Sequence, residues 1–145
     1  MTHYHTAAMA QRAILGGWTI ELDDGFQRRV DGGDVMFWQP PRTVYATVYA
    51  SGDAGAEEAI ARMIEGRPGT PVQKFDRVQP GAAGHAYLLP EGEGRERYWG
   101  LNTWTATRDS VACVTFYFEQ LDDLEWALAA WRSVRCEPPD RRYLN

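Results

Sequence analysis

The fold of this chain is decided by residues 85–118, HAYLLPEGEGRERYWGLNTWTATRDSVACVTFYF. Alternate residues of this stretch sort into two kinds, and a period of two is typical of β-strands, whose successive side chains point to opposite faces. The mostly aliphatic set indicates a core face and comprises Ala86, Leu88, Trp99, Leu101, Ala112, Val114, Phe116 and Phe118. The polar and aromatic set comprises His85, Tyr87, Tyr98, Asn102, Trp104, Thr115 and Tyr117. The stretch therefore predicts strands with one face on a core and the other open to contact, since Tyr and Trp combine contact area with a polar group.

Further strands and one helix are predicted before this stretch. Residues 18–22 and 43–49 alternate, and residues 26–30 and 35–38 flank DGGD at 31–34, which is typical of a hairpin turn. Beyond these strands the period becomes helical, with Asp53 as the expected N-cap and with Gly66 and Pro68 at the end of the helix. Residues 72–78 indicate one more short strand. The order predicts three strands, a helix, three or four strands and a last helix.

The last helix has the clearest expected start. Asp122 followed by Glu125 matches a capping box, and Leu121 stands at staple spacing from Trp126. An apolar stripe follows, formed by Leu124, Leu128 and Trp131, with Ala127 and Val134 beside it. Such a stripe is expected to lie on a sheet.

The predicted fold class is α+β: an antiparallel β-sheet of six to seven strands with two helices packed on one face, a two-layer sandwich. No segment has the pattern of a crossover between parallel strands. The length of 145 residues fits a single domain over residues 1–145. We expect flexible ends at about residues 1–13 and 137–145.

Composition and charge exclude several classes of function. A net charge of −5 argues against sequence-independent binding of nucleic acid, which needs clustered Lys and Arg, and favours a basic partner. No run of apolar residues is long enough for membrane insertion, and no signal peptide is evident, so the expected location is cytoplasmic. Cys113 and Cys136 fit no metal spacing and are expected to be two thiols.

With its elements in this order, the chain resembles the Mog1/PsbP-like family of α+β sandwiches, which includes the DcrB-like adaptor proteins of bacterial secretion systems. The resemblance covers nearly the whole chain. It depends on element order, on the tryptophan-led strand at 18–22, and on WRSV at 131–134 after FYF at 116–118. It implies a non-enzymatic binding module, of a size that bacterial immunity proteins share. It transfers no functional residue to this chain.

The residues that could form catalytic or metal-binding sites also have structural explanations. His3 and His5 with His85 could hold a metal, but nothing supplies the missing ligands, and we predict no metal and no cofactor. Cys113 and His85 share a face and form the best catalytic pair, although a strand cysteine is usually a small apolar residue. Three carboxylate pairs fall at turns or helix starts, where they satisfy backbone N–H groups: Asp23 with Asp24, Glu57 with Glu58, and Asp122 with Asp123. No catalytic residue is therefore predicted.

The remaining candidate site is the tyrosine-rich face, which has the composition of a recognition surface. We predict that a protein partner contacts Tyr45, Tyr49, Tyr87, Tyr98, Asn102, Trp104 and Tyr117, with Asp31, Asp34, Glu91 and Glu93 in acidic loops around it. The same residues could instead lie under the N-terminal arm or a dimer partner, or be ordinary solvent-facing strand residues. The leading hypothesis is an immunity protein that neutralises a basic toxin by direct binding. The alternatives are a secretion-system adaptor for an effector, and a small-ligand-binding or enzymatic α+β domain.

Overall fold

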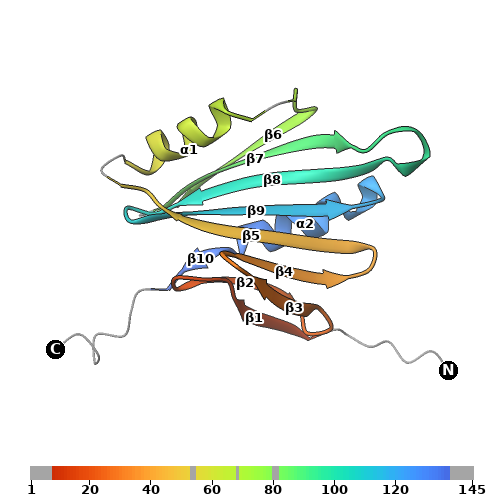
Figure 1. Ribbon diagram of the computed structural model, residues 1–145, viewed down its shortest axis with the longest axis horizontal. Coiled ribbons are helices and arrows are strands. Elements are labelled where there is room, and N and C mark those ends of the chain that lie inside the picture. The colour runs from red at the N-terminus through yellow and green to blue at the C-terminus, as the bar shows by residue number, and fades with distance from the viewer. Residues whose placement is uncertain (1–7, 53–54, 68, 80–81, 138–145) are drawn as a thin grey trace.

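The architecture is α+β and consists of two antiparallel sheets and two α-helices (Figure 1). The computed structural model describes residues 8–52, 55–67, 69–79 and 82–137. The larger sheet has seven strands in the order β3-β4-β5-β9-β8-β7-β6, and every neighbouring pair is antiparallel. Its strands are β3 (Gln27–Asp31), β4 (Asp34–Gln39), β5 (Arg42–Ala50), β6 (Gln73–Gln79), β7 (Ala82–Glu91), β8 (Tyr98–Ala106) and β9 (Ser110–Phe118). The predicted strands at 26–30, 35–38, 43–49 and 72–78 are therefore confirmed to within a few residues.

A second, smaller sheet closes the lower side of the molecule in Figure 1. It consists of β1 (Met9–Ala13), β2 (Trp18–Asp23) and β10 (Arg135–Cys136), in the order β1-β2-β10. Residues 9–13 were expected to belong to a flexible arm, but they form β1 and pair with β2 along its length. Their pairing leaves no free backbone edge on that side of β2. The rest of both expected flexible ends lies outside the described residues, apart from Ala8 and Glu137. The carbonyl of Ala8 accepts from the backbone N–H of Asp24 at 3.0 Å, and the backbone N–H of Glu137 donates to the carbonyl of Gly17 at 2.8 Å.

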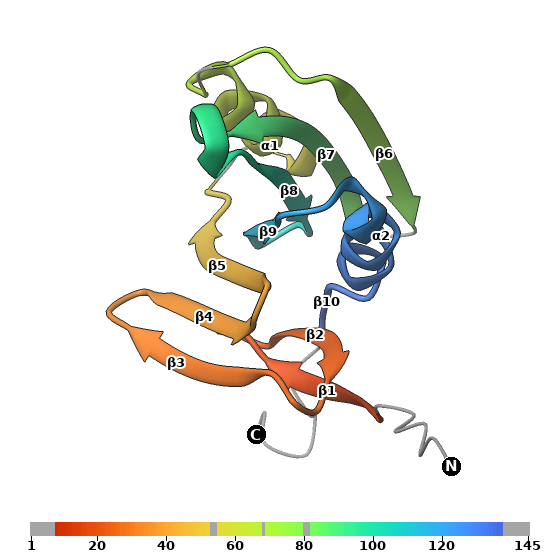
Figure 2. The same cartoon turned by 90° about the vertical axis from the view of Figure 1, so that its right-hand side faces the viewer.

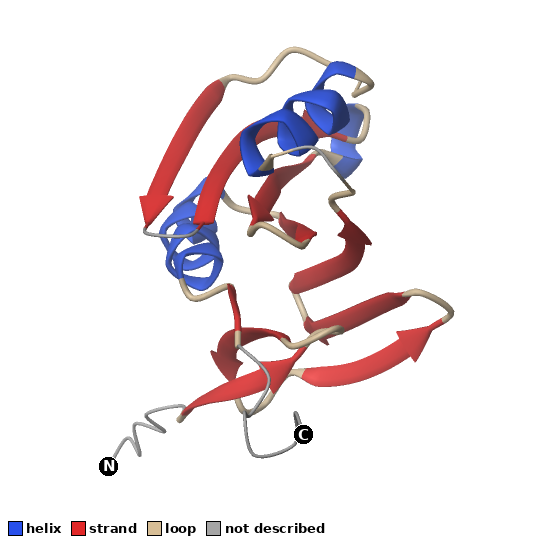
Figure 3. Cartoon of the chain, turned by 90° about the vertical axis from the view of Figure 1, so that its left-hand side faces the viewer, coloured by secondary structure: helices blue, strands red, loops and turns tan. Residues whose placement is uncertain are grey.

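The two helices lie on opposite faces of the seven-stranded sheet (Figures 2 and 3). They are α1 (Ala56–Glu65) and α2 (Leu124–Arg132). The 3₁₀ turn η1 (Gly94–Glu96) lies between β7 and β8, and the 3₁₀ turn η2 (Leu121–Asp123) directly precedes α2. The expectation that both helices share one face is not confirmed. The aliphatic face is filled by α2 together with β2, and α1 buries its own apolar side chains against the polar and aromatic face.

The main core lies between the aliphatic face, α2 and the smaller sheet. Trp18, Ile20 and Leu22 of β2 point into it, as their alternation predicted. Trp131 of α2 is 1% exposed and donates from Nε1 to Oγ1 of Thr105 at 3.0 Å. The packing of Trp131 against β7 favours a glycine at position 84, because a Cβ on Gly84 would lie 3.1 Å from the Trp131 ring. These contacts fix α2 against β7 and β8.

The start of α2 differs from its prediction. The helix begins after the η2 turn with Asp123 as N-cap, and no side chain caps it. The carboxylate of Asp123 instead accepts from Arg42 of β5 at 2.7 Å, and the Arg42 guanidinium lies 4.6 Å from the centre of the Trp126 ring. Leu121, the residue predicted to form the staple, is 48% exposed. A tertiary ion pair therefore holds the start of α2. Asp53, the predicted N-cap of α1, lies outside the described residues.

Candidate functional site

The polar and aromatic face is built from transverse rows of residues that the strand register brings together. One row runs Asp34, Thr47, Cys113, Trp104, His85 and Asp76, and the next runs Met36, Tyr45, Thr115, Asn102, Tyr87 and Lys74. Side chains directly opposite on antiparallel strands lie close together on one face. The register therefore gathers five of the eleven predicted site residues in these two rows, namely Asp34, Tyr45, Tyr87, Asn102 and Trp104.

Part of this face is covered by α1. Ile60 packs with Trp104, Ala106 and Val111, and Met63, Ile64 and Tyr87 border the same cluster. Trp104 is consequently 3% exposed and Asn102 is 1% exposed. Both predicted contact residues are therefore almost wholly covered within this chain, and their contact with a partner stays a prediction. The physical reason for their burial is that the apolar stripe of α1 must be buried, and the aliphatic face is already filled by α2 and β2.

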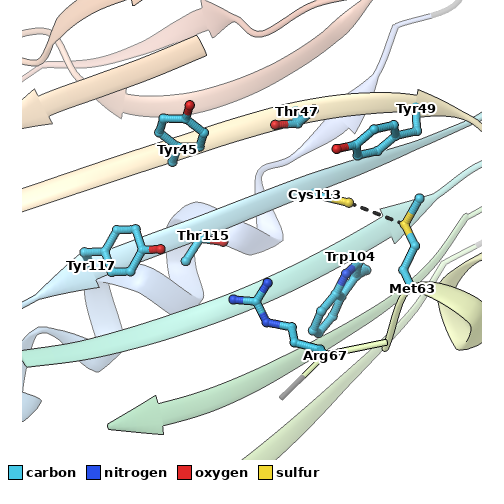
Figure 4. Close-up of a pocket in the computed structure, with 9 residues that line it drawn as sticks. All are labelled: Tyr45, Thr47, Tyr49, Met63, Arg67, Trp104, Cys113, Thr115 and Tyr117. Carbon is cyan, nitrogen blue, oxygen red and sulfur yellow. Dashed lines mark hydrogen bonds between the residues drawn. The ribbon is translucent and has the colours of Figure 1, made fainter. Parts of the chain in front are cut away.

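An open hollow of about 410 Å³ remains between α1 and strands β5 and β9 (Figure 4). We call it the tyrosine hollow, and its lining residues are Tyr45, Thr47, Tyr49, Met63, Arg67, Trp104, Cys113, Thr115 and Tyr117. Tyr45 and Tyr49 keep 39% and 50% of their surface exposed. Five of the lining side chains carry hydroxyl groups and one carries a positive charge.

One wall of the tyrosine hollow is organised by Asp34. Its carboxylate accepts from the hydroxyl of Thr47 at 2.6 Å and from the hydroxyl of Tyr45 at 2.7 Å. The bonds from Thr47 and Tyr45 lower the pKa of Asp34, and the bond to Asp34 raises the pKa of Tyr45. Each hydroxyl has one proton to donate, so both are left with acceptor capacity only. This wall therefore offers hydrogen-bond acceptors, and the carboxylate of Asp34 lies behind it.

The opposite wall is organised by Arg67, which follows α1 in the chain. Its guanidinium donates to the side-chain oxygen of Asn102 and lies 5.8 Å from the centre of the Trp104 ring. Figure 4 shows it extending past Trp104 toward Thr115 and Tyr117. The buried Asn102 and Trp104 thus hold a cation inside the hollow, which is a supporting role different from the one predicted for them.

Tyr98 and Tyr117 form an aromatic pair at one end of the face. Their ring centres lie 5.8 Å apart in an edge-on arrangement, and Tyr98 is 38% exposed. Burial raises the pKa of Tyr117, the charge of Glu91 adds to that effect, and the charge of Arg67 opposes it. Glu91 pairs with Tyr98 in the β7–β8 ladder. Glu91, the last residue of β7, therefore lies near Tyr117 at this end of the face.

The other predicted partner-contact residues are spread over the surface. Asp31 is exposed and paired with Arg29 at 3.2 Å, and Glu93 is exposed in the loop between β7 and η1. Tyr87 is half-buried beside α1, with its ring edge-on to Trp104 and the ammonium of Lys74 5.1 Å from its centre. Tyr87 therefore lies across α1 from the hollow, whereas Asp31 ends β3 and Glu93 lies in a loop.

His85 and Cys113 lie on one face but do not form a pair. Both are register partners of Trp104, so its indole stands between them. The Cys113 thiol faces the sulfur of Met63 at 3.5 Å, and burial raises its pKa to about 11. A thiol with that pKa is almost wholly protonated at neutral pH and is a poor nucleophile. The best catalytic pair of the sequence is therefore not assembled.

His85 instead connects α1 to the sheet. Its Nδ1 lies 2.6 Å from a carboxylate oxygen of Asp76 on β6, and its Nε2 lies 3.1 Å from one of Glu57 on α1. Burial lowers the pKa of His85, but the hydrogen bonds and charges of Glu57 and Asp76 outweigh it, and the pKa is raised. Both ring nitrogens can donate to carboxylates only in the imidazolium form.

The paired carboxylates have structural partners. Asp23 accepts from the backbone N–H of Gly25 at 2.9 Å within the turn after β2, and Glu58 accepts from Arg62 one turn along α1. Among the described residues, no three His, Cys, Asp or Glu side chains come together in a way that could hold a metal ion. His3 and His5 lie outside the described residues.

Sequence reasoning missed Arg67 as a lining residue. The residue stands in a polar loop after Gly66, where a single arginine carries no pattern. Its place becomes visible only when α1 is docked, because the docking decides where the following segment runs. The hydrogen bonds from Tyr45 and Thr47 to Asp34 could not be predicted from the sequence either, since they depend on the register of β4 with β5.

No protein-family model and no curated protein matches this chain. Among solved structures, a protein from Bacteroides thetaiotaomicron superposes on 85% of this chain with a TM-score of 0.65 and 12% identity. The match covers 46% of that protein, so this chain spans a little under half its length. A Pseudomonas aeruginosa protein of unknown function, described as a candidate regulator, matches 91% of this chain and 99% of its own, with a TM-score of 0.50 and 18% identity. At such identities the likeness concerns the fold alone.

The resemblance to the Mog1/PsbP-like family is not tested by these matches and stays a prediction. Within the part of the chain that is described, no helix is long and apolar enough to cross a membrane.

Proposed function

We propose that this chain is a non-enzymatic protein-binding module, and specifically a cytoplasmic bacterial immunity protein that neutralises a cognate toxin by direct binding. The observation that carries the proposal is the tyrosine hollow, where Tyr45, Tyr49 and Tyr117 gather on a face that α1 leaves open. Tyrosines among threonines have the composition of a protein recognition surface, because rigid rings supply contact area at low entropic cost.

The charge around the hollow supports a basic partner. Asp34 lies at one wall and Glu91 near the opposite end, and the chain carries a net charge of −5. Acidic groups at the rim of an interface accelerate association with a basic protein, and buried aromatic groups slow its release. The expected partner is a basic toxin domain encoded beside this chain.

The test measures binding to the product of each neighbouring gene by calorimetry, and growth when that product is co-expressed with this chain. Tyr45→Ala and Tyr49→Ala should each weaken binding by about 2 kcal/mol if they are central anchors. Met9→Ala is the matched control, since Met9 is 61% exposed on β1 of the smaller sheet. Circular dichroism should show that all three variants remain folded. The proposal fails if no neighbouring product binds, or if the three substitutions have equal effects.

A secretion-system adaptor is the second candidate within the class of protein-binding modules. An adaptor that shields an apolar segment needs an apolar groove, whereas the lining here contains five hydroxyl groups and a guanidinium. The lining therefore favours the immunity form. Binding to an effector that is lost when its hydrophobic helix is removed would favour the adaptor instead.

A small-ligand-binding domain is the candidate from another class, and the volume of the hollow favours it. About 410 Å³ falls in the usual range for small-molecule sites, which is roughly 300–1,000 Å³. Such a site should bind a metabolite with the partner absent. Thermal stabilisation by one compound of a metabolite panel, lost in Tyr117→Ala, would favour this candidate.

A further inference from the structure

We infer that the tyrosine hollow accepts a carboxylate side chain of the partner, and that Lys or Arg residues flank this carboxylate on the partner. The inference rests on the proposed function and specifies the chemistry of its partner. It follows from the positive charge of Arg67 inside the tyrosine hollow and the negative charges of Asp34 and Glu91 at its rim.

Arg67 supplies the positive centre. It is the one cation in the lining, and the lining contains no carboxylate. None of the described Asp or Glu side chains lies within ion-pair distance of its guanidinium. A guanidinium has five N–H groups in a planar fork, and Asn102 accepts from one of its nitrogens, Nη2. The remaining donors match the planar geometry of a carboxylate.

The guanidinium is held in place before any partner arrives. Asn102 is 1% exposed and Trp104 is 3% exposed, and both are fixed within β8. The amide of Asn102 and the face of Trp104 position Arg67 from two sides. A side chain that is already positioned loses less conformational entropy on binding. The folded chain therefore already orients the Arg67 guanidinium into the tyrosine hollow before a partner binds.

Tyr117 supplies a further donor beside Arg67. Figure 4 shows its hydroxyl pointing toward the middle of the hollow, near Thr115. The Tyr45 and Thr47 hydroxyls differ, because they already donate to Asp34. The hollow is thus polarised, with donors at the Arg67 wall and acceptors at the Asp34 wall.

The rim has the opposite sign. Asp34 lies behind the Tyr45 wall and Glu91 borders Tyr117. A carboxylate at Arg67 would be repelled by these groups unless its neighbours were basic. In a partner segment in which Lys residues flank one Glu, the Glu can bind Arg67 while the Lys residues face the acidic groups at the rim. A wholly basic segment would leave Arg67 facing like charge.

The experiment uses nuclear magnetic resonance on the full chain, including the Nε–H signals of arginine. The probes are a short blocked peptide with one Glu between Lys residues, and the same peptide with Gln in place of Glu. The Glu peptide should shift the signals of Arg67, Thr115 and Tyr117 and bind about 5-fold more tightly, since hydrogen bonds to charged groups exceed neutral ones by about 1 kcal/mol. Arg67→Gln should abolish this difference.

Arg62→Gln is the matched control, because Arg62 is an exposed arginine of α1 that pairs with Glu58. It should leave the preference for Glu intact. The inference is overturned if the two peptides bind equally, if neither binds at millimolar concentration, if the shifts map elsewhere, or if folded Arg67→Gln keeps the preference. Failure of the peptides with a neighbouring protein still bound through Tyr45 and Tyr49 would remove the inference and leave the proposed function standing.

Discussion

The seven-stranded sheet carries one helix on each face, and the two helices cover their faces to different extents. On one face, α2 and β2 enclose a core of aliphatic and aromatic residues that are almost wholly buried. On the other face, α1 covers the region around Trp104 and leaves Tyr45 and Tyr49 exposed. The same strands therefore bury one set of alternate residues in the main core and leave part of the other set open to solvent.

The difference between the faces follows from the number of apolar side chains available to cover each. The aliphatic face receives the apolar side of α2 and three inward residues of β2. The aromatic face receives α1 alone, whose fully buried residues are Ala59 and Ile60. A smaller cover leaves part of the sheet open, and hydroxyl-bearing residues occupy that part. Functional surfaces are commonly found where a scaffold is least covered.

The largest expected effect on stability comes from removing a buried tryptophan, and it should differ between Trp131 and Trp104. Trp131→Ala should lower the free energy of unfolding by about 3–5 kcal/mol, because it removes a fully buried ring and leaves a cavity. Trp104→Ala should cost less, because its ring also borders the tyrosine hollow, from which water can enter. Urea denaturation followed by circular dichroism measures both. An equal or larger cost for Trp104 would remove the distinction between the two faces.

The next effect concerns the thiol under α1. A pKa near 11, against 9.0 for an ordinary thiol, implies a thiolate fraction at pH 8 that is roughly 100-fold smaller. Cys113 should therefore react with iodoacetamide about 100-fold more slowly than an unfolded cysteine. Mass spectrometry of the native and urea-unfolded chain measures the ratio, with Cys136 as the internal comparison. Fast labelling of Cys113 in the folded chain would mean that α1 covers this face only loosely.

A smaller effect is the pH dependence of the contact between α1 and the sheet. The folded-state pKa of His85 is raised above its unfolded value of 6.5, so protonated His85 stabilises the folded state. This contribution is complete below about pH 6.5 and is lost as the pH rises through the folded-state pKa. The stability advantage of the native chain over His85→Gln should therefore be largest below about pH 6.5 and decline as the pH rises above it. Denaturation series at fixed ionic strength measure it.

Glu57→Gln provides the check on this assignment. The substitution removes the α1 carboxylate that faces Nε2 and keeps Asp76 at Nδ1. It should lower the pKa of His85, as read from the histidine ring signals by magnetic resonance. A His85 pKa that does not move would show that Glu57 does not connect α1 to the sheet.

The smallest effect concerns the wall of the tyrosine hollow. Asp34→Asn removes the charge that accepts from Tyr45 and Thr47, so the pKa of the Tyr45 phenol should fall toward 10.0. Ultraviolet titration of tyrosine ionisation measures the change. Asp31→Asn is the control, because Asp31 pairs with Arg29 and lies farther along the hairpin. Equal effects of the two substitutions would mean that Asp34 does not organise this wall.

Much of the fold could be predicted from alternation. The strands at 18–22, 43–49 and 85–118 stand where the pattern put them, with Ala86, Val114 and Phe116 in the core. Period and turn chemistry are local properties, so they are legible in the residues themselves. The start of α2 was predicted wrongly, because Asp123 satisfies a distant arginine instead of a local cap.

The candidate site could be predicted only in part. Tyr45, Tyr49, Tyr98 and Tyr117 are on the expected face with exposed or half-buried side chains. Asn102 and Trp104 belong to the same face by alternation, yet lie under Arg67 and α1. Alternation assigns a residue to a face but says nothing of what covers that face.

By itself, the sequence determined which side chains share each face of each strand, because the two-residue period is a property of the extended backbone. Only the tertiary structure decided that α1 and α2 take opposite faces, that Trp104 is buried, and that Arg67 reaches the tyrosine hollow. The docking of a helix depends on which apolar surface remains uncovered once the rest of the chain has packed. The apolar surface that remains uncovered is a property of the whole molecule, so no local sequence pattern predicts it.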